Sequence, residues 1–521
     1  MSRPRRALTS WRMPCTLRPC PSVAKSPLAL MLPPMATPNP IPEAHDESPS
    51  SDAKPVDLIA TLARMKDAQR KGGTPTYEKR IERLDKLLKG LLVHKDDFVR
   101  AISEDFGNRS KHETLVAEVF TTIQAIKHCR AHMHEWMEVE PRPVSWLFAP
   151  ARAEVISQPL GVVGIIAPWN YPMQLALAPL AAALAAGNRA MIKPSELTPK
   201  TGEMLAKLAK EFFADDELVV VTGGADVGAA FSALPFDHLL FTGSTRVGKI
   251  VMRAAAENLV PVTLELGGKS PTIIGEDFPI DVAATRVMYG KCFNAGQTCI
   301  APDYVMVPRA QVERFIEECK AAVAKMLPTL KSNPDYTSIV NAQHYKRLAG
   351  YIEEAKKSDA KVIEVNPAKE ELPAEDHKLA PTLVIDPPKE LALMNEEIFG
   401  PILPVIPYDK LDDAIAYVND HPRPLALYFF GYDDDDVANV VDHTISGGVS
   451  INETLMHFAQ EDLPFGGVGP SGIGHYHARE GFDAFSKKKP VFYQARVNGA
   501  GLLRPPYGKT IDLALRFLVG K

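Results

Sequence analysis

One uncharged stretch limits what this chain can fold into. Residues Val155–Asn188 contain no Asp, Glu, Lys or Arg, and an apolar run of this length is sufficient to cross a membrane as a helix. Prolines interrupt the run at several points, and each one removes a helical hydrogen bond. We therefore expect a buried strand over Gly161–Ala167, a turn that carries Asn170, and a buried helix rich in Ala and Leu, and no membrane span.

Strand-like and helix-like segments alternate after this stretch. The further strands are expected at Arg189–Ile192, Leu218–Val221, His238–Phe241 and Val262–Leu266, and the helices at Thr198–Phe213, Val227–Leu234 and Thr245–Asn258. Alternation at this spacing is typical of a doubly wound parallel sheet. A second α/β unit is expected after Gly268, with strands near Tyr304–Val307, Ile402–Ile406, Tyr428–Phe430 and Gly448–Ile451. The fold class is thus α/β, and helical spacing over 56–137 precedes the first sheet.

The composition excludes some functions. The formal net charge is −5, which gives no basic surface for nucleic acid. The cysteines are scattered and form no CxxC pair, so the sequence predicts neither a zinc site nor a disulfide framework. We expect no metal cofactor, and a reducing compartment such as the cytoplasm.

Cys299 is the candidate nucleophile. It stands in the run Phe293–Pro302 (FNAGQTCIAP), where small and polar residues and a proline predict a turn. A thiolate becomes reactive when backbone N–H groups or a helix end stabilise the anion. Taken alone, Cys299 could equally be a small buried side chain, and that is how we interpret the neighbouring Cys292.

Two other residues would complete a site that attacks a carbonyl group. Glu265 stands beside the flexible pair Gly267-Gly268, and Asn170 lies on the predicted strand-to-helix turn. In such a site the thiol attacks, the Asn170 amide stabilises the oxyanion, and the Glu265 carboxylate activates water.

The turn Phe241–Lys249 (FTGSTRVGK) is the candidate phosphate-binding segment. Gly243, Ser244 and Gly248 are small residues at a predicted helix N-terminus, where backbone N–H groups and the helix dipole favour phosphate. The same residues are one position short of a P-loop, because Ile250 stands where Mg²⁺ binding requires Ser or Thr. We therefore expect a nucleotide site and not a phosphotransferase.

Lys193 and Glu196 follow a predicted strand end, where α/β folds bind ligands. A carboxylate there can hold a ribose diol and repels a 2′-phosphate, which favours NAD over NADP. The alternative for Glu196 is a carboxylate near the N-terminus of the following helix.

Several motifs occur together in a recognisable order. FNAGQTCIAP, LELGGKSP, APWNYP, IKPSE, FTGSTRVGK and EEIFGP resemble the NAD(P)-dependent aldehyde dehydrogenase superfamily, over about Leu58–Lys509. QTCIAPDYV and LPFGGVGPSGIGHYH are most similar to its class 3 branch, and the whole chain to the coniferyl aldehyde dehydrogenases. The resemblance implies oxidation of an aromatic or long-chain aldehyde to the acid, through a thiohemiacetal and a thioester on Cys299. It also implies NAD as the hydride acceptor, with NADP used by some relatives, and a homodimer.

The resemblance assigns roles to further residues. It implies that Glu196 contacts the adenine ribose, and that Glu397 and Phe399 contact the nicotinamide ribose and ring. Trp169 is expected to form a wall of the pocket. The loop Thr454–Phe458 is expected to line the substrate entrance.

The resemblance also suggests how the chain is divided. The expected parts are an NAD-binding domain over 51–139 and 159–267, a catalytic domain over 268–465, an oligomerisation element with a β-hairpin over 140–158 and 488–503, and C-terminal segments 466–487 and 504–521 that pack on the core. Residues 1–50 are expected to be a disordered extension or the product of a start upstream of Met35. A transit peptide is the alternative, because basic but no acidic residues precede Glu43.

Two other functions stay open at this point. A cysteine-dependent acyltransferase or thioesterase would use the same thiol and oxyanion donors without nicotinamide, and the Lys193/Glu196 pair and the Gly243 turn argue against it. A catalytically silent homologue would have no need to retain Cys299, Glu265 and Asn170 together.

Overall fold

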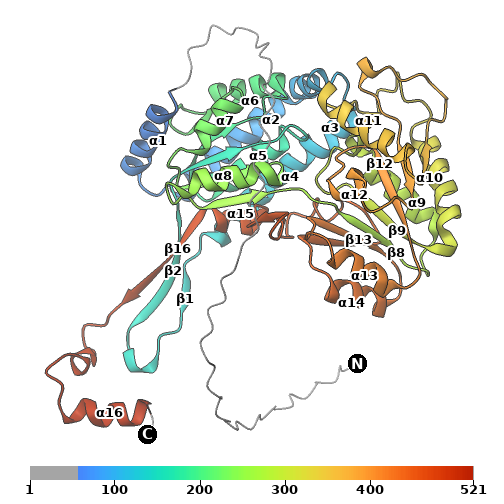
Figure 1. Cartoon of the computed structure of the whole chain (residues 1–521). Coiled ribbons are helices and arrows are strands. Elements are labelled where there is room, and N and C mark those ends of the chain that lie inside the picture. Colours follow the sequence, from blue (N-terminus) through green and yellow to red (C-terminus); the bar gives the residue numbers. More distant parts are fainter. Residues whose placement is uncertain (1–56, 520–521) are drawn as a thin grey trace, which may run out of the picture. The chain divides into compact units, whose positions relative to one another are not determined.

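The computed structural model describes residues 57–519. The expected N-terminal extension over 1–50 lies outside the described residues. The described chain contains a six-stranded, a seven-stranded and a three-stranded sheet, which can be followed in Figure 1. Within these residues no helix combines the length and the apolar character needed to cross a membrane.

The six-stranded sheet has the order β15-β7-β6-β3-β4-β5. Its strands are β3 (Val162–Ile166), β4 (Arg189–Lys193), β5 (Leu218–Val220), β6 (His238–Thr242), β7 (Val262–Glu265) and β15 (Gly472–Ile473). β3 to β7 pair in parallel, and β15 is antiparallel to β7. The chain runs outward from β3 through β4 and β5, and then returns to build β6 and β7 on the other side. This order confirms the predicted doubly wound sheet.

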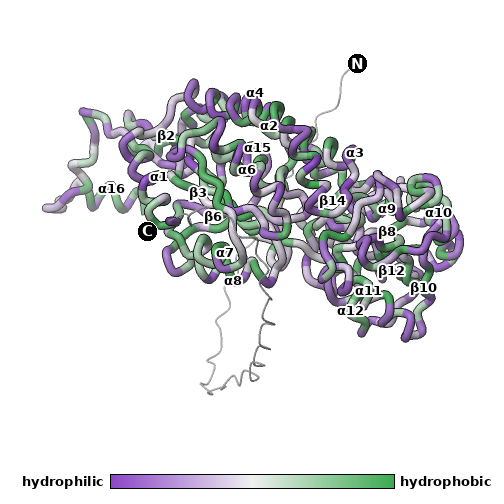
Figure 2. The backbone as a smooth tube through the Cα atoms, turned by 90° about the horizontal axis from the view of Figure 1, so that it is seen from above, coloured by the Kyte–Doolittle hydropathy of each residue, from purple (hydrophilic) through white to green (hydrophobic). Residues whose placement is uncertain are grey.

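Helices cover both faces of this sheet. Successive strand residues point to opposite sides, so each strand has side chains to bury on both faces. In β3, Val163 and Ile165 join one core cluster and Val162 joins another. The first cluster includes α2 (Tyr77–Phe106), α4 (Thr121–Trp136), α5 (Gln174–Ala185) and α6 (Pro199–Phe212), and the second includes α1 (Leu58–Gly72), α7 (Ala225–Ser232) and α8 (Thr245–Ala256). Figure 2 shows the hydrophobic β3 and β6 between α6 on one side and α7 and α8 on the other.

The helices before the sheet follow from local signals. α2 begins after Thr76, whose hydroxyl accepts a hydrogen bond from the Lys79 amide at 3.4 Å, and ends at Gly107 in the left-handed conformation with φ 73°. α3 (Lys111–Thr114) comes next, and a π-helical turn η1 (Leu115–Phe120) joins it to α4. The sequence predicted helix over this whole region but gave no sign of the π-helical turn.

The seven-stranded sheet has the order β10-β11-β12-β9-β8-β13-β14. Its strands are β8 (Pro271–Ile274), β9 (Tyr304–Pro308), β10 (Lys361–Glu364), β11 (Thr382–Ile385), β12 (Ile402–Tyr408), β13 (Ala426–Phe430) and β14 (Gly448–Ile451). All neighbours pair in parallel except β10 with β11. Sequence analysis located β9, β12, β13 and β14, and missed the four-residue strands β8, β10 and β11.

Helices cover both faces of this sheet too. The longer ones are α9 (Ile280–Cys292), α10 (Val312–Met326), α11 (Ala342–Lys356), α13 (Leu411–Asn419) and α14 (Asp434–His443). Residues of α9, α10 and α11 belong to the largest core cluster, whereas residues of α13 and α14 belong to a separate one. The two clusters therefore lie on opposite faces.

The three-stranded sheet is antiparallel, with β2 (Arg152–Pro159) between β1 (Glu140–Arg142) and β16 (Ser486–Tyr493). The last helix, α16 (Lys509–Val519), lies beyond the end of β16 in Figure 1. Within α16 only Ile511 is buried, and Phe517 is 82% exposed. Most of the apolar side chains of α16 are therefore exposed in the described chain.

Candidate active site

The carboxyl ends of the parallel strands carry many of the residues singled out by sequence. Trp169 and Asn170 follow β3, Lys193 ends β4, Gly243 follows β6, and Glu265 ends β7. In doubly wound sheets ligands bind at this edge, where the strand order reverses. Here that point lies between β3 and β6.

Cys299 and Glu265 lie where two cavities meet. One cavity is lined mainly by apolar side chains, and the other by the ends of β3 and β6 and by residues of the second α/β unit. The two cavities share Thr242, Glu265, Leu266 and Cys299. A reactant in each cavity would therefore meet its partner beside the thiol and the carboxylate.

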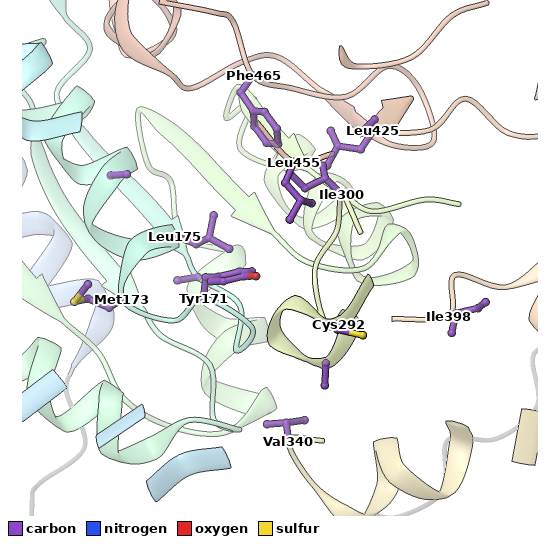
Figure 3. Packing of buried hydrophobic residues seen from close by; sticks show 14 of the residues in the cluster. Tyr171, Met173, Leu175, Cys292, Ile300, Val340, Ile398, Leu425, Leu455 and Phe465 are labelled. Carbon is purple, nitrogen blue, oxygen red and sulfur yellow. The ribbon is translucent and has the colours of Figure 1, made fainter. Parts of the chain in front are cut away.

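The first cavity, here called the apolar cavity, is walled by aromatic and aliphatic side chains. Figure 3 shows Tyr171 and Leu175 on one side, and Ile300, Leu455 and Phe465 from other segments. The loop expected at the entrance contributes Leu455, Met456 and Phe458. The cavity therefore suits an aromatic or alkyl group next to the reacting carbon.

The second cavity, here called the cofactor cavity, has an aromatic wall. The ring centroid of Trp169 lies 4.9 Å from that of His344 and 5.3 Å from that of Phe399. All three residues line the cavity, as does Glu397. The Glu397 Oε1 atom is buried and has no hydrogen-bond partner among the described residues. An unpaired buried acceptor of this kind is ready for a ligand hydroxyl.

The carboxylate of Glu397 lies directly against the backbone at Gly267. A Cβ atom at Gly267 would overlap both carboxylate oxygens. Burial, together with the nearby Asp303, raises the pKa of Glu397 to about 8. The part of the cofactor cavity beside Glu397, here called the Glu397 crevice, contains this unpaired acceptor and fits a ribose hydroxyl.

An ion pair holds the Glu397 segment in place. Lys269 forms a salt bridge with Asp303, and its ammonium group donates to the Glu396 carbonyl at 3.0 Å. Asp303 Oδ1 accepts a hydrogen bond from the Ile398 amide at 2.9 Å. The backbone on both sides of Glu397 is thereby tied to the start of the second sheet.

The residues of the turn after β6 have two roles: some line the cofactor cavity, and others allow α8 to pack closely. Gly243 and Ser244 line the cofactor cavity, and the Ser244 hydroxyl caps α8 by accepting from the Val247 amide at 3.3 Å. Gly248 does not line this cavity. A Cβ there would lie 2.7 Å from Leu266 Cδ2, so the glycine permits close packing of α8 on the residue after β7.

Lys193 and Glu196 are paired with each other, at a distance of 3.0 Å between Lys193 Nζ and Glu196 Oε2. Lys193 is buried and Glu196 is 46% exposed. Neither residue lines the cavity that contains Cys299. The pair lies at the end of β4, next to β3, and so belongs to the same edge of the sheet as the cofactor cavity.

The loop before Cys299 is held in an uncommon conformation. Asn294 and Ala295 have φ values of 52° and 51°, in the left-handed region that disfavours side chains with a Cβ. Gly296 follows with φ 73°, and a Cβ there would overlap the Gly400 carbonyl. The thiol-bearing loop therefore lies tightly against the Phe399–Gly400 turn.

The two proposed chemical groups are both poorly solvated. Burial, with the neighbouring Glu397 and Glu265, raises the pKa of the half-buried Cys299 thiol to about 12. Burial raises the pKa of Glu265 well above its usual value, and neither of its carboxylate oxygens has a hydrogen-bond partner among the described residues. A carboxylate with a raised pKa is a stronger base towards a substrate or water. Cys292, in contrast, is buried in the core and is labelled in Figure 3.

Asn170 is anchored by its backbone. Its carbonyl oxygen accepts from Arg109 Nη1 at 2.6 Å and from Asn294 Nδ2 at 3.2 Å. Asn170 also lines the cofactor cavity beside Cys299. The backbone contacts leave the side-chain amide available as a donor.

Sequence analysis missed several residues of the site. His344 and Arg347 line the cofactor cavity from α11, and Arg109 and Glu118 lie behind Asn170. His344 and Arg347 lie in an ordinary α-helix, Arg109 lies in the loop before α3, and Glu118 lies in η1, so no local signal in the sequence marks them. Among residues 57–519 no group of His, Cys, Asp and Glu side chains forms a metal site.

The comparisons with known proteins agree with this geometry. The aldehyde dehydrogenase family model matches residues 36–491. A probable coniferyl aldehyde dehydrogenase of Caulobacter vibrioides is 50% identical over 479 residues, which cover 91% of this chain and 98% of the relative. Aldehyde dehydrogenase family 3 member A2 of Pongo abelii is 38% identical over 447 residues, covering 85% of this chain and 90% of the relative.

A solved structure supports the same conclusion. The substrate-bound state of Staphylococcus aureus AldH superposes with a TM-score of 0.83 at 37% sequence identity, covering 88% of this chain and 99% of that one. The fold class predicted from sequence and the resemblance to the family are therefore confirmed. The chain belongs to the aldehyde dehydrogenase family.

Proposed function

We propose that this chain oxidises aldehydes to carboxylic acids with Cys299 as the nucleophile, Asn170 as an oxyanion donor and Glu265 as the base for water. The observation that carries the proposal is the position of Cys299 and Glu265 at the junction of the apolar and cofactor cavities. An aldehyde in one cavity and a hydride acceptor in the other would meet at the thiol.

The first step is attack of the Cys299 thiolate on the aldehyde carbon. The proton leaves the thiol, an S–C bond forms, and the carbonyl oxygen becomes an oxyanion. The Asn170 amide and the Cys299 backbone N–H donate hydrogen bonds to that oxyanion. Because the thiol has a raised pKa, a base must take its proton, and the adjacent Glu265 carboxylate is suitably placed.

Collapse of the thiohemiacetal releases a hydride and leaves a thioester on Cys299. When bound, nicotinamide supplies the hydride acceptor. This chain contributes the aromatic wall of Trp169 and Phe399 and the unpaired Glu397 acceptor, which would hold the acceptor molecule by its ring and its ribose.

Hydrolysis completes the cycle. Glu265 takes a proton from water, the hydroxide attacks the thioester carbon, and the C–S bond breaks to release the acid and the thiolate. Neither Glu265 oxygen has a hydrogen-bond partner among the described residues, so both can accept a hydrogen bond from water, which supports this role. Between the two transfers, Glu265 releases the proton from the thiol to solvent, so that its carboxylate can take one from water.

NAD is the proposed acceptor. Family membership supports a nicotinamide cofactor, and the Glu397 crevice supports a ribose contact. The exposed Glu196 carboxylate beside Lys193 would accept hydrogen bonds from the adenine ribose and repel a 2′-phosphate. NADP is therefore the weaker acceptor.

The proposed substrates are aromatic aldehydes of the coniferyl aldehyde type, with long-chain aldehydes as the second class. The apolar cavity has walls of aromatic and aliphatic side chains, and a relative at 50% identity is named a probable coniferyl aldehyde dehydrogenase. Short hydrophilic aldehydes would leave this cavity unfilled.

Three organisational proposals accompany the chemistry. The six-stranded sheet serves an NAD-binding domain over 51–139 and 159–267, and the seven-stranded sheet serves a catalytic domain over 268–465. The three-stranded sheet mediates a homodimer, supported by exposed apolar residues such as Trp146, Phe492 and Val497. The protein works in the cytoplasm, supported by the unpaired cysteines of the described chain.

The experiment is a screen for NADH formation with a panel of aromatic, long-chain and short aldehydes. Wild-type protein should reduce NAD⁺ with aromatic aldehydes, and Cys299→Ala should lose activity while it still binds NAD⁺. The matched control is Cys292→Ala, which should retain most activity. Turnover of thioesters without any aldehyde-dependent NADH would favour an acyltransferase or thioesterase instead.

A further inference from the structure

Next to the active site, one short segment, Arg109–Phe120, has two buried ionisable side chains, Arg109 and Glu118, and a partly buried one, Glu113. It comprises Arg109, α3 and the π-helical turn η1. π-helical turns are rare and often occur at functional sites. Arg109 and Glu118 are buried, and burial also raises the pKa of Glu113. Val116 and Ala117 of this segment line the apolar cavity, but its charged residues Arg109, Glu113 and Glu118 line neither cavity, so their charges need another explanation.

Arg109 and Glu118 form an ion pair with no solvent access. Arg109 Nη1 lies 3.1 Å from Glu118 Oε1, and both side chains are fully buried. A buried pair adds little to stability, because each charge loses its hydration. Arg109 Nε and Nη2 have no acceptor among the described residues. The pair is therefore poorly explained as a stabilising contact alone.

The pair instead holds both ends of the Asn170 turn. Arg109 Nη1 donates to the Asn170 carbonyl at 2.6 Å. Glu118 Oε2 accepts from the Met173 amide at 2.8 Å and the Gln174 amide at 3.1 Å, at the N-terminus of α5. Between these points, the Arg109 guanidinium lies 4.7 Å from the centroid of the Tyr171 ring.

Glu113 holds the opposite side of the site. Both of its carboxylate oxygens lie 3.2 Å from the Asn294 amide nitrogen, in the loop that leads to Cys299. Asn294 Nδ2 in turn donates to the Asn170 carbonyl at 3.2 Å and to the Gln297 carbonyl at 3.0 Å. Hydrogen bonds of the backbone amide and of the side-chain amide thus hold Asn294 in its left-handed conformation.

We propose that Arg109, Glu118 and Glu113 are positioning residues that set the separation between the Asn170 amide and the Cys299 loop. The proposal rests on the proposed function, since it concerns the oxyanion site of that reaction. Oxyanion donors are effective only when they are held in place before charge develops, and a displacement of about 1 Å can cost about 10²-fold in rate.

The main test is the double variant Arg109→Met/Glu118→Leu. Removal of both charges avoids leaving one unpaired in the interior. Hydride transfer should slow by about 10- to 100-fold in this variant. The measurement is the pre-steady-state burst of NADH with saturating coniferyl aldehyde and NAD⁺. The dissociation constant of NAD⁺ should stay within about twofold, because the segment does not line the cofactor cavity.

A matched control removes a different buried ion pair, which joins α2 to the turn before β5. Arg83 Nε lies 3.0 Å from Glu217 Oε1, with side chains that are 4% and 8% exposed, away from both cavities. Arg83→Met/Glu217→Leu should leave the burst rate per active site unchanged. Glu118→Gln, which keeps the shape and one acceptor oxygen, should slow the burst less than the double variant does.

A deuterium isotope effect separates positioning from loss of structure. With aldehyde deuterated at C1, the isotope effect on kcat should rise in the double variant, because hydride transfer becomes limiting. A wild-type burst rate and isotope effect in the folded double variant would overturn the proposal. If that variant does not fold, a wild-type burst and isotope effect in Glu118→Gln would overturn it. Activity in Cys299→Ala would instead overturn the proposed function.

Discussion

The hydroxyl groups of Tyr171 and Thr298 lie 2.6 Å apart in the protein interior. Tyr171 directly follows Asn170, and Thr298 directly precedes Cys299. One hydrogen bond therefore links the turn after β3 to the loop that carries the thiol. The hydrogen bond between Asn294 and the Asn170 carbonyl joins the same two loops. Both bonds therefore limit the movement of one loop relative to the other.

Tyr171→Phe should slow hydride transfer by about 3- to 10-fold, because it removes one hydrogen bond of about 1 kcal/mol that aligns the two loops. The burst of NADH measures this step. Tyr408→Phe is the control, since the Tyr408 hydroxyl makes a buried bond of 2.6 Å to the Ile274 carbonyl outside the site. Equal effects of the two variants on the burst would contradict a local alignment role.

Alkylation of Cys299 should accelerate with pH. Because the pKa of this thiol is raised to about 12, the thiolate fraction should increase about tenfold per pH unit between about pH 7 and 9, without a plateau. Iodoacetamide labelling of the Cys299 peptide, quantified by mass spectrometry without NAD⁺, measures this fraction. A plateau below about pH 8 would show that the thiol is already activated in the free protein.

Glu196→Gln should narrow the preference for NAD over NADP. The variant keeps a hydrogen-bonding side chain beside Lys193 but removes the charge that repels a 2′-phosphate. The ratio of kcat/KM values for the two cofactors is the measurement. An unchanged ratio would assign Glu196 to the Lys193 pair alone.

The sequence was sufficient to predict the doubly wound sheet because hydrophobic strands and amphipathic helices alternate at regular spacing. It also singled out Cys299 and Asn170, which stand in predicted turns, and Glu265, which stands beside the pair Gly267-Gly268. The structure brings Cys299 and Glu265 to the same two cavities. Short strands such as β10 and β15 carry too few residues for a period to appear.

The residues that support the site could not be predicted in this way. Arg109 meets Asn170, and Glu118 meets Met173, only through tertiary packing. Arg347 reaches the cofactor cavity from a helix with an ordinary amphipathic pattern. Gly248 illustrates the opposite case: its motif suggested a phosphate contact, whereas a Cβ there would overlap Leu266. The sequence of α16 likewise contains no local signal that distinguishes an exposed apolar face from one that packs on the core.

The timing of the two catalytic groups tests the account most directly. Glu265→Gln should form about one equivalent of NADH per site in a slowed burst and then stall, because the thiol loses its proton acceptor and the thioester is no longer hydrolysed. Mass spectrometry of the stalled protein should find the acyl group of the aldehyde as a thioester on the Cys299 peptide. Asn170→Ala should show no burst, since loss of one oxyanion donor costs about 10²–10³ in kcat. Full steady-state turnover of Glu265→Gln, or an acyl group elsewhere than Cys299, would contradict the mechanism.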